Sequence, residues 1–139
     1  MNTERTLAII KPDAVAAGLA GPIIAHLERE GFGIVAMKKV TLTENQARAF
    51  YRVHRERPFY GSLVRFMTSG PVIPMVLERD NAIAALREVM GATNPDEAAE
   101  GTLRKLYATN IERNAIHGSD ASETSAVERQ FFFSHLELS

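Results

Sequence analysis

Short apolar runs alternate along the chain with stretches in which apolar residues recur at helical spacing. Four of the runs have the length of a β-strand, and they cover residues 5–11, 32–42, 71–79 and 131–136. The third run contains Pro74, which has no backbone N–H to donate to a neighbouring strand. We therefore expect this strand to lie at an edge of the sheet or to contain a bulge.

Helical spacing and end signals predict helices between these strands. The first covers residues 21–31, where Pro22 stands in the first turn and Gly31 can end the helix. Thr43 and Gln46 have the spacing of a capping box, which opens the next helix. Further helical segments are predicted over residues 59–70, from Asp80 or Asn81 to Gly91, and over residues 119–130, where Asp120 and Glu123 repeat the capping-box spacing.

This order of strands and helices predicts a fold of the α/β class, an α+β sandwich. With four strands and one hairpin-like step, a ferredoxin-like arrangement fits best, in which helices cover a four-stranded antiparallel sheet. A long stretch of weak periodicity, about residues 92–113, is expected to be an irregular loop. No internal repeat or linker is visible, so we expect one domain over residues 1–139.

The composition adds few positive signals but excludes some functions. The formal net charge is −1, so the overall charge does not point to nucleic acid or to an acidic membrane as a partner. The sequence contains no cysteine, which excludes a disulfide framework and thiolate catalysis. The first residues lack the features of a secretion signal, and no apolar run approaches the roughly 20 residues that span a bilayer. We expect a soluble, cytoplasmic protein with no membrane partner.

Several common catalytic and binding motifs are missing from the sequence. Neither the phosphate-binding loop G-x-x-x-x-G-K-[ST] nor the dinucleotide motif G-x-G-x-x-G occurs. Histidine pairs with the spacing of a zinc site and the G-x-S-x-G motif of acyl transfer are also missing. If the protein binds a nucleotide, other residues must hold the phosphates.

Three cationic residues have both a structural and a chemical explanation. Lys11 ends an apolar strand, either as a solvated terminus or as a cation at the end of a sheet. Arg87 shares a helical face with apolar neighbours, so we expect it to be buried against a carboxylate or an anion, because a guanidinium keeps its charge. The structural alternative is a salt bridge, or a side chain that snorkels to solvent. Arg104 lies in the long irregular stretch, either as a solvated loop charge or as part of a functional loop.

The histidine in the segment RNAIHGSDA has the most suggestive surroundings. His117 precedes Ser119 and Asp120, which read as the cap of the next helix, and the N-terminus of a helix attracts phosphate. A neutral imidazole is nucleophilic near pH 7, so His117 could accept a phosphoryl group. The structural alternative is a capped turn with a histidine facing solvent. Together with the three cations, it would form a site for phosphoryl transfer, which depends on charge neutralisation and positioning.

The chain also contains, in this order, the segments IIKPDAV, ERPFYG, FMTSGPV, LREVMGATNP, EGTLR and NAIHGSDA. Together these segments resemble nucleoside diphosphate kinase from about residue 5 to residue 133. The resemblance implies an enzyme that moves the γ-phosphate of a nucleoside triphosphate, mainly ATP, to a nucleoside diphosphate and so maintains (deoxy)nucleoside triphosphate pools. It also implies a ping-pong mechanism through a phosphohistidine, low base specificity and a requirement for Mg²⁺.

The resemblance assigns roles to individual residues. His117 corresponds to the phosphorylated histidine, and the nucleotide-binding residues would be Lys11, Phe59, Arg87, Thr93, Arg104 and Asn114. Among these, Phe59 would stack on the base and Asn114 would contact the ribose. Tyr51, Ser119 and Glu128 correspond to residues that pack near the histidine or orient it. No protein ligand is expected for Mg²⁺, which the nucleotide phosphates would hold, and Asp120 would affect the metal only indirectly.

The resemblance further implies a homo-oligomer built from dimers, with a tetramer and a hexamer both open. The sequence departs from the family pattern at Lys105-Leu106, Ala121 and Arg129, which concerns loop packing and subunit contacts more than chemistry. Two other functions stay as alternatives. The chain could sense nucleotides without turnover, or it could bind nucleic acid as a side activity through the basic segment RVHRERPF.

Overall fold

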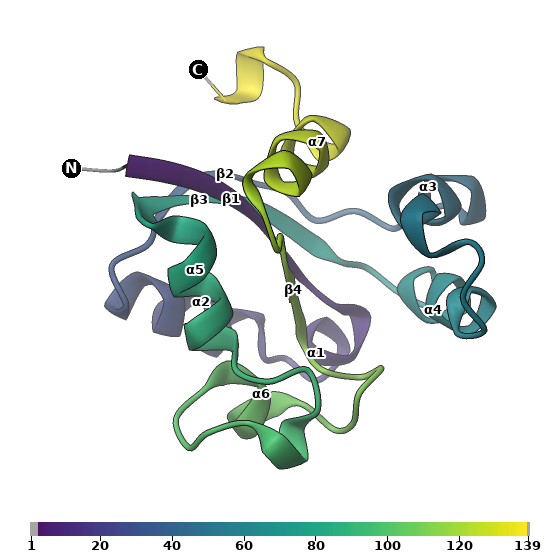
Figure 1. Ribbon diagram of the computed structural model, residues 1–139, viewed down its shortest axis with the longest axis horizontal. Helices are drawn as coiled ribbons and strands as arrows, with labels where there is room; N and C mark the ends of the chain where they lie inside the picture. Colours follow the sequence, from purple (N-terminus) through teal and green to yellow (C-terminus); the bar gives the residue numbers. More distant parts are fainter. Residues whose placement is uncertain (1–2, 139) are drawn as a thin grey trace.

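The computed structural model describes residues 3–138, which form a four-stranded antiparallel sheet with helices packed against it (Figure 1). The strands lie in the order β2-β3-β1-β4. Their bounds are Thr3–Ile10 for β1, Gly33–Met37 for β2, Ile73–Asp80 for β3 and Ile116–Gly118 for β4. The predicted fold class, a ferredoxin-like sheet covered by helices, is confirmed.

The helices fill the connections between strands over the described residues. The α-helices are α1 (Pro12–Ala16), α2 (Ala20–Arg29), α3 (Glu44–Phe50), α4 (Tyr60–Met67), α5 (Ala82–Met90), α6 (Leu103–Tyr107) and α7 (Ser122–Phe132). Short 3-10 helices are η1 (Arg52–His54), η2 (Pro95–Glu97) and η3 (Leu136–Leu138). In Figure 1, α2 and α5 lie next to each other on one side of the sheet, and α3, α4 and α7 lie on the other side.

The two central strands are buried on both faces, which gives the molecule two hydrophobic clusters. Successive side chains of a strand point to opposite faces. Leu7 and Ile9 of β1 accordingly pack in the cluster beneath α3 and α4, whereas Ala8 and Ile10 pack in the cluster beneath α2 and α5. All four side chains are fully buried. This arrangement explains why the sequence of β1 is continuously apolar instead of alternating.

Pro74 lies in the central strand β3, so the expectation of an edge strand is wrong. Its carbonyl oxygen accepts a hydrogen bond of 3.2 Å from the backbone N–H of Lys38, so the polar backbone atoms of Pro74 face towards β2. The ladder of β2 stops at Met37 and pairing resumes at a bridge between Val40 and Val72, so the missing N–H of Pro74 falls in the gap between them. The irregular pairing between β2 and β3 lies further along, between Ile34 and Ala36.

The fourth strand is not the one that the last apolar run predicts. Residues 131–136 cover the end of α7, a connecting segment and the start of η3, so the predicted strand there is wrong. The fourth strand is instead Ile116–Gly118, which pairs with β1 through Ile9 and His117. Three residues are too few to show an apolar pattern, and their partner lies more than a hundred positions away in the sequence. The histidine segment is therefore part of the sheet.

The start of α7 also differs from the prediction. The N-cap is Ala121, whose N–H donates to Thr124 Oγ1 at 3.0 Å, and that hydroxyl donates to Asp120 Oδ1 at 2.8 Å. The predicted capping box between Asp120 and Glu123 is therefore wrong by one position. Ser119 and Asp120 precede the helix, which begins at Ser122.

Two other predictions about helix ends and loops can be compared with the structure. The capping box of Thr43 and Gln46 is confirmed by reciprocal hydrogen bonds of 3.1 and 2.9 Å. The stretch 92–113 is less regular than the rest but contains η2 and α6, and Thr102 caps α6 by accepting from the N–H of Lys105. Arg104 thus lies on a short helix within the loop.

Gly118 allows β4 to approach α5 closely, and a larger residue there should destabilise the fold. A methyl group at position 118 would lie 2.7 Å from Met90 Sδ and 2.9 Å from Leu86 Cδ2, both of which belong to fully buried side chains. We expect Gly118→Ala to lower the free energy of unfolding by about 1–3 kcal/mol. In the matched control, Gly21→Ala, the new methyl group meets nothing within 4 Å on α2, so its stability should be unchanged or slightly higher. Urea unfolding of both variants tests this, and equal stability would contradict it.

Candidate active site

The ring of His117 lies on the face of the sheet that α3 and α7 cover. Its strand, β4, is an edge strand that pairs with β1, with Ile9 opposite His117. The His117 ring makes edge contacts with two aromatic rings, Phe50 at 5.5 Å and Tyr51 at 6.3 Å between centroids. Phe50 ends α3 and Tyr51 follows it, so the end of one short helix supplies both contacts. These contacts restrict the orientation of the imidazole.

Glu128 fixes the second property of His117, its tautomer. His117 Nε2 lies 2.9 Å from Glu128 Oε1, and Ser119 Oγ donates to the same oxygen at 2.7 Å. An ionised carboxylate can only accept hydrogen bonds, so the proton of a neutral imidazole belongs on Nε2. The lone pair of the neutral ring is then on Nδ1. Glu128 comes from α7 and Ser119 from the residue after β4, so a helix and a strand end act together on the ring.

Two arginines bind the open edge of β4. The backbone N–H of Lys11 donates to the carbonyl of Ala115, and the backbone N–H of Ser119 donates to the carbonyl of Leu7. The backbone groups of Ala115 and Ser119 therefore face β1. The carbonyls of Ile116 and Gly118 therefore face the open edge of the sheet. Arg104 Nη2 donates to the carbonyl of Ile116 at 2.9 Å, and Arg87 Nη1 donates to that of Gly118 at 3.3 Å. The two guanidinium groups thus lie on either side of His117 along the strand.

The two arginines differ in burial. Arg104 is 5% exposed, its Nη1 also donates to the carbonyl of Gly91 at 3.1 Å, and its Nε has no hydrogen-bond partner among the described residues. Burial, and then the charge of Arg87, lower the pKa of Arg104 to about 10. Arg87 itself is exposed, so the expectation that it is buried is wrong. Its side chain extends from α5 to the neutral carbonyl of Gly118. The predicted contact with a carboxylate does not occur among the described residues.

Lys11 lies in a buried polar cluster. Lys11 Nζ donates to Asn114 Oδ1 at 2.8 Å and to the carbonyl of Glu112 at 3.3 Å, and Asn114 Nδ2 donates to the carbonyl of Thr93 at 3.3 Å. Both Lys11 and Asn114 are buried. Burial, and then the charge of Arg104, lower the pKa of Lys11 to about 8. The cluster connects the end of β1 with both ends of the 92–113 loop.

The other predicted residues differ in exposure. Phe59 precedes α4 and is 47% exposed, with its ring 5.5 Å from that of His54. Thr93 is exposed, and Asp120 is exposed with Thr124 as its hydrogen-bond partner. Tyr51 is buried, its hydroxyl has no partner among the described residues, and burial together with the charge of Glu128 raises its pKa. Of the predicted set, Lys11, Arg87, Arg104, Asn114, Ser119, Glu128 and Tyr51 are tied to β4 or to one another by these interactions.

Sequence reasoning missed two residues that help to hold this arrangement. Phe50 contacts the His117 ring but looks like an ordinary core residue of a helix. Asp13 Oδ2 accepts a hydrogen bond of 3.1 Å from the N–H of Ala115, which has a φ of 73°, a conformation unusual for alanine. Asp13 therefore supports the strained backbone just before β4. A carboxylate two residues after the lysine that ends a strand was the available signal.

Comparison with known proteins shows to which family this chain is related. A sequence profile of the family described as nucleoside diphosphate kinase matches residues 4–138. The chain belongs to the nucleoside diphosphate kinase family. It is 59% identical over 138 residues to the nucleoside diphosphate kinase of Persephonella marina, covering 99% of each chain, and 57% identical over 135 residues to that of Oleidesulfovibrio alaskensis, covering 97% of each.

Solved structures of the family are similar as well. The nucleoside diphosphate kinase of Aquifex aeolicus superimposes with a TM-score of 0.97 at 46% identity, covering 99% of both chains. That of Halobacterium salinarum, solved in complex with CDP, gives a TM-score of 0.95 at 40% identity, covering 99% of this chain and 92% of the other. The resemblance seen in the sequence is confirmed, and the chain is a phosphotransferase that binds nucleotides. Over residues 3–138, no helix is both long and apolar enough to cross a membrane.

The lowered pKa of Lys11 predicts how stability depends on pH. The unfolded chain binds the Lys11 proton up to about pH 10.5, whereas the folded chain releases it near pH 8, so the unfolded state binds more protons between these values. Stability contributed by this group should therefore rise between pH 8 and pH 10.5, by roughly 3 kcal/mol at most. Lys11→Met should remove this rise. Urea unfolding of both proteins from pH 7 to pH 10.5 measures it, and a difference that does not change with pH would contradict the prediction.

Proposed function

We propose that the chain transfers the γ-phosphate of a nucleoside triphosphate, mainly ATP, to a nucleoside diphosphate through a phosphohistidine at His117. The single observation that carries this proposal is the hydrogen bond between Nε2 of His117 and Glu128, because it leaves the lone pair of the neutral ring on Nδ1. Family membership supports phosphate transfer between nucleotides, and the geometry around His117 supports this residue as the carrier of the phosphoryl group.

In the first half-reaction, Nδ1 of His117 attacks the γ-phosphorus. A bond forms between Nδ1 and phosphorus, the bond from phosphorus to the β,γ-bridging oxygen breaks, and the nucleoside diphosphate leaves with those electrons. Glu128 accepts the hydrogen bond from Nε2–H, so this proton stays on the imidazole. The carboxylate also stabilises the positive charge on the ring. In the second half-reaction, a terminal oxygen of another nucleoside diphosphate takes the phosphoryl group from Nδ1. The mechanism is ping-pong because the first nucleoside diphosphate leaves before the second binds, and one nucleotide pocket can serve both in turn.

The cations around β4 would neutralise the phosphates during transfer. Lys11, Arg87 and Arg104 form no ion pair with a carboxylate among the described residues, so their charges are available to an anionic substrate. The hydroxyl of Thr93 would bind the same phosphates. The hydroxyl of Tyr51, buried without a hydrogen-bond partner among residues 3–138, would donate to the phosphoryl group. Fixed donors aimed at developing charge are the main source of rate enhancement in phosphoryl transfer.

The nucleoside would be recognised with little regard to its base. Half-exposed Phe59 offers one aromatic face, and every base can stack on such a face. Asn114, together with Lys11, would bind the ribose. Because specificity then depends on the sugar and the phosphates, we propose that the enzyme accepts purine and pyrimidine nucleotides alike and maintains triphosphate pools in the cytoplasm.

Mg²⁺ is proposed as the cofactor, bound to the nucleotide. Magnesium usually keeps several waters and binds the phosphates of its substrate. Residues 3–138 contain no cluster of three or more His, Cys, Asp or Glu side chains able to hold a metal. Asp120 would affect the bound ion only indirectly. When bound, the ion would offset phosphate charge alongside Lys11, Arg87 and Arg104. We also propose a homo-oligomer of dimers, tetramer or hexamer, which light scattering can decide.

Replacing His117 tests the central proposal. We expect His117→Ala to slow phosphate transfer from ATP to GDP or CDP by at least about a thousandfold, because the covalent route is closed. Wild-type protein incubated with ATP should carry phosphate that is labile to acid and stable to alkali, and the variant should not. His26→Ala, on α2, is the matched control and should behave like wild type.

Two outcomes would overturn the proposed mechanism. The first is transfer at the normal rate by His117→Ala. The second is a wild-type protein that binds ATP but exchanges no phosphate, as a nucleotide-sensing module would.

The proposed role of Glu128 can be tested separately from that of His117. Glu128→Ala removes the acceptor for Nε2–H, so the rate of histidine phosphorylation should fall by at least about tenfold. Glu128→Gln keeps an amide oxygen that can accept, so part of the rate should return. Glu123→Gln, an exposed residue of the same helix, is the control. Rapid-mixing measurements of phosphoenzyme formation compare the variants, and equal rates for Glu128→Ala and wild type would disprove the role.

A further inference from the structure

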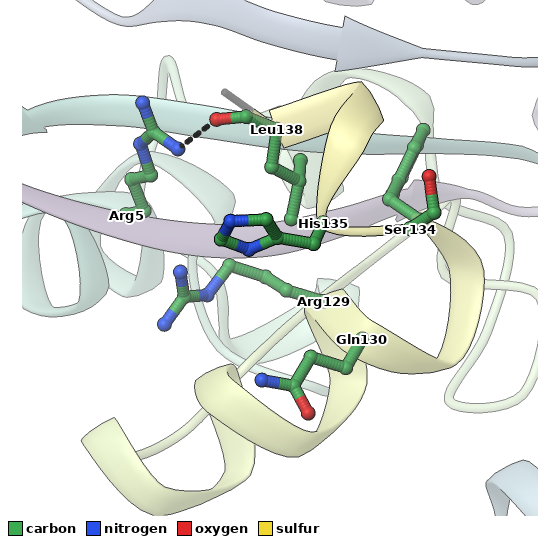
Figure 2. A pocket seen from close by; sticks show the side chains of 7 residues that line it. Arg5, Arg129, Gln130, Ser134, His135 and Leu138 are labelled. Carbon is green, nitrogen blue, oxygen red and sulfur yellow. Dashed lines mark hydrogen bonds between the residues drawn. The ribbon is translucent and has the colours of Figure 1, made fainter.

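A second pocket, whose lining includes two arginines, lies beside α7 and the segment that follows it. The pocket has a volume of about 450 Å³, and its lining includes Arg5, Arg129, Ser134 and His135. Figure 2 shows Arg129 and His135 extending in the same direction from α7 and from the segment after it, whereas Arg5 extends from β1 towards the carbonyl of Leu138. None of these residues belongs to the set proposed for nucleotide transfer. The pocket therefore needs its own explanation.

Arg5 is held in place at one side of this pocket. Arg5 Nε donates to Glu78 Oε2 at 2.8 Å, and Arg5 Nη1 donates to the carbonyl of Leu138 at 2.7 Å (Figure 2). The remaining terminal nitrogen, Nη2, has no hydrogen-bond partner among the described residues. A guanidinium fixed at two nitrogens loses little freedom when the third binds a ligand.

Arg129 presents more free donors than Arg5. Its Nε donates to both the carbonyl and the hydroxyl of Ser125 at 3.2 Å, which fixes the plane of the group. Neither Nη1 nor Nη2 has a hydrogen-bond partner within residues 3–138. Burial, and then the charge of Arg5, lower the pKa of Arg129, so the two guanidinium groups are close enough to repel each other.

None of the carboxylates among residues 3–138 neutralises Arg129. Glu78 pairs with Arg5, and Glu137 pairs with Lys38 at 3.1 Å while it also accepts from the N–H of Ser134. No carboxylate of the described residues lies within 4 Å of the Arg129 guanidinium. A partly buried cation next to a second cation is stabilised when an anion binds between them.

We propose that the pocket between Arg5 and Arg129 binds a small phosphate-bearing anion, either free orthophosphate or the phosphate group of a nucleotide. A carboxylate has two oxygens, which the free fork of Arg129 alone would satisfy. The pocket offers further donors from other directions, namely Arg5 Nη2, the hydroxyl of Ser134 and the ring of His135. A tetrahedral anion with several oxygens matches such a set better than a planar one.

The position of Arg129 on α7 keeps this site separate from the candidate active site. Glu128 and Arg129 are neighbours, and successive helical residues point about 100° apart. Glu128 faces the His117 ring, whereas Arg129 folds back along the helix to Ser125. Binding at Arg129 therefore does not require any residue of the phosphotransfer mechanism.

Titration of orthophosphate or ADP into ¹⁵N-labelled protein, followed by NMR, tests the site. The amide signals of residues 133–138 report on this pocket, and those of residues 114–118 report on the candidate active site. We expect either ligand to shift the first group of signals. A response to orthophosphate identifies the free anion as sufficient, and a response to ADP alone identifies the phosphate of a nucleotide, and both support the proposal. No response of these signals to either ligand would overturn it.

Variants of Arg129 make the test specific. Arg129→Leu keeps an apolar stem but removes the guanidinium group, so the affinity read from residues 133–138 should fall by about tenfold. Arg129→Lys retains a point charge and should recover part of that loss. Arg29→Leu removes the same charge at an exposed position of α2 and should leave the affinity unchanged. An equal effect of Arg29→Leu and Arg129→Leu would show that only net charge matters and would overturn the proposal. Phosphate transfer at the wild-type rate shows that each variant is folded.

Discussion

The backbone of β4 has two edges, and a different kind of partner satisfies each one. The inner edge forms hydrogen bonds with β1, and the carbonyls of the outer edge accept from Arg87 and Arg104. A three-residue strand at the edge of a sheet would otherwise leave polar groups unpaired. The same contacts bring two cations to either side of His117. The two arginines therefore both satisfy the edge of the strand and place positive charge beside His117.

The cations around this strand repel each other. Arg104 lowers the pKa of Lys11, and Arg87 lowers that of Arg104, while burial is the larger cause in both cases. Neutral oxygens of the carbonyls and of Asn114 provide the hydrogen bonds, so the positive charge itself stays uncompensated among the described residues. Such an arrangement opposes folding to some degree, and it is stabilised by a ligand rich in negative charge. This uncompensated charge is the physical basis for the proposal that nucleotide phosphates bind here.

Helix α7 connects the two polar regions of the molecule. Its Glu128 fixes the tautomer of His117, and its Arg129 faces the second pocket. Arg129 is also one of the positions where the sequence departs from the family pattern. A departure that adds a second cation beside Arg5 changes the local electrostatics without touching the chemistry at β4. The fold thus tolerates new surface chemistry within one residue of a site whose geometry is tightly constrained.

The sequence by itself determined the fold class, the strands β1, β2 and β3, most helices and the family. These depend on local apolar spacing and on motifs that are short, continuous segments of sequence. The resemblance also named the residues around His117. Tertiary structure alone decided that His117 lies on a strand, that Arg87 is exposed and that Pro74 is central, because each depends on a partner distant in the chain. It also revealed Phe50 and Asp13, whose roles follow from what they contact in space. Local patterns select secondary structure, but strand pairing and contacts between elements determine which side chains meet.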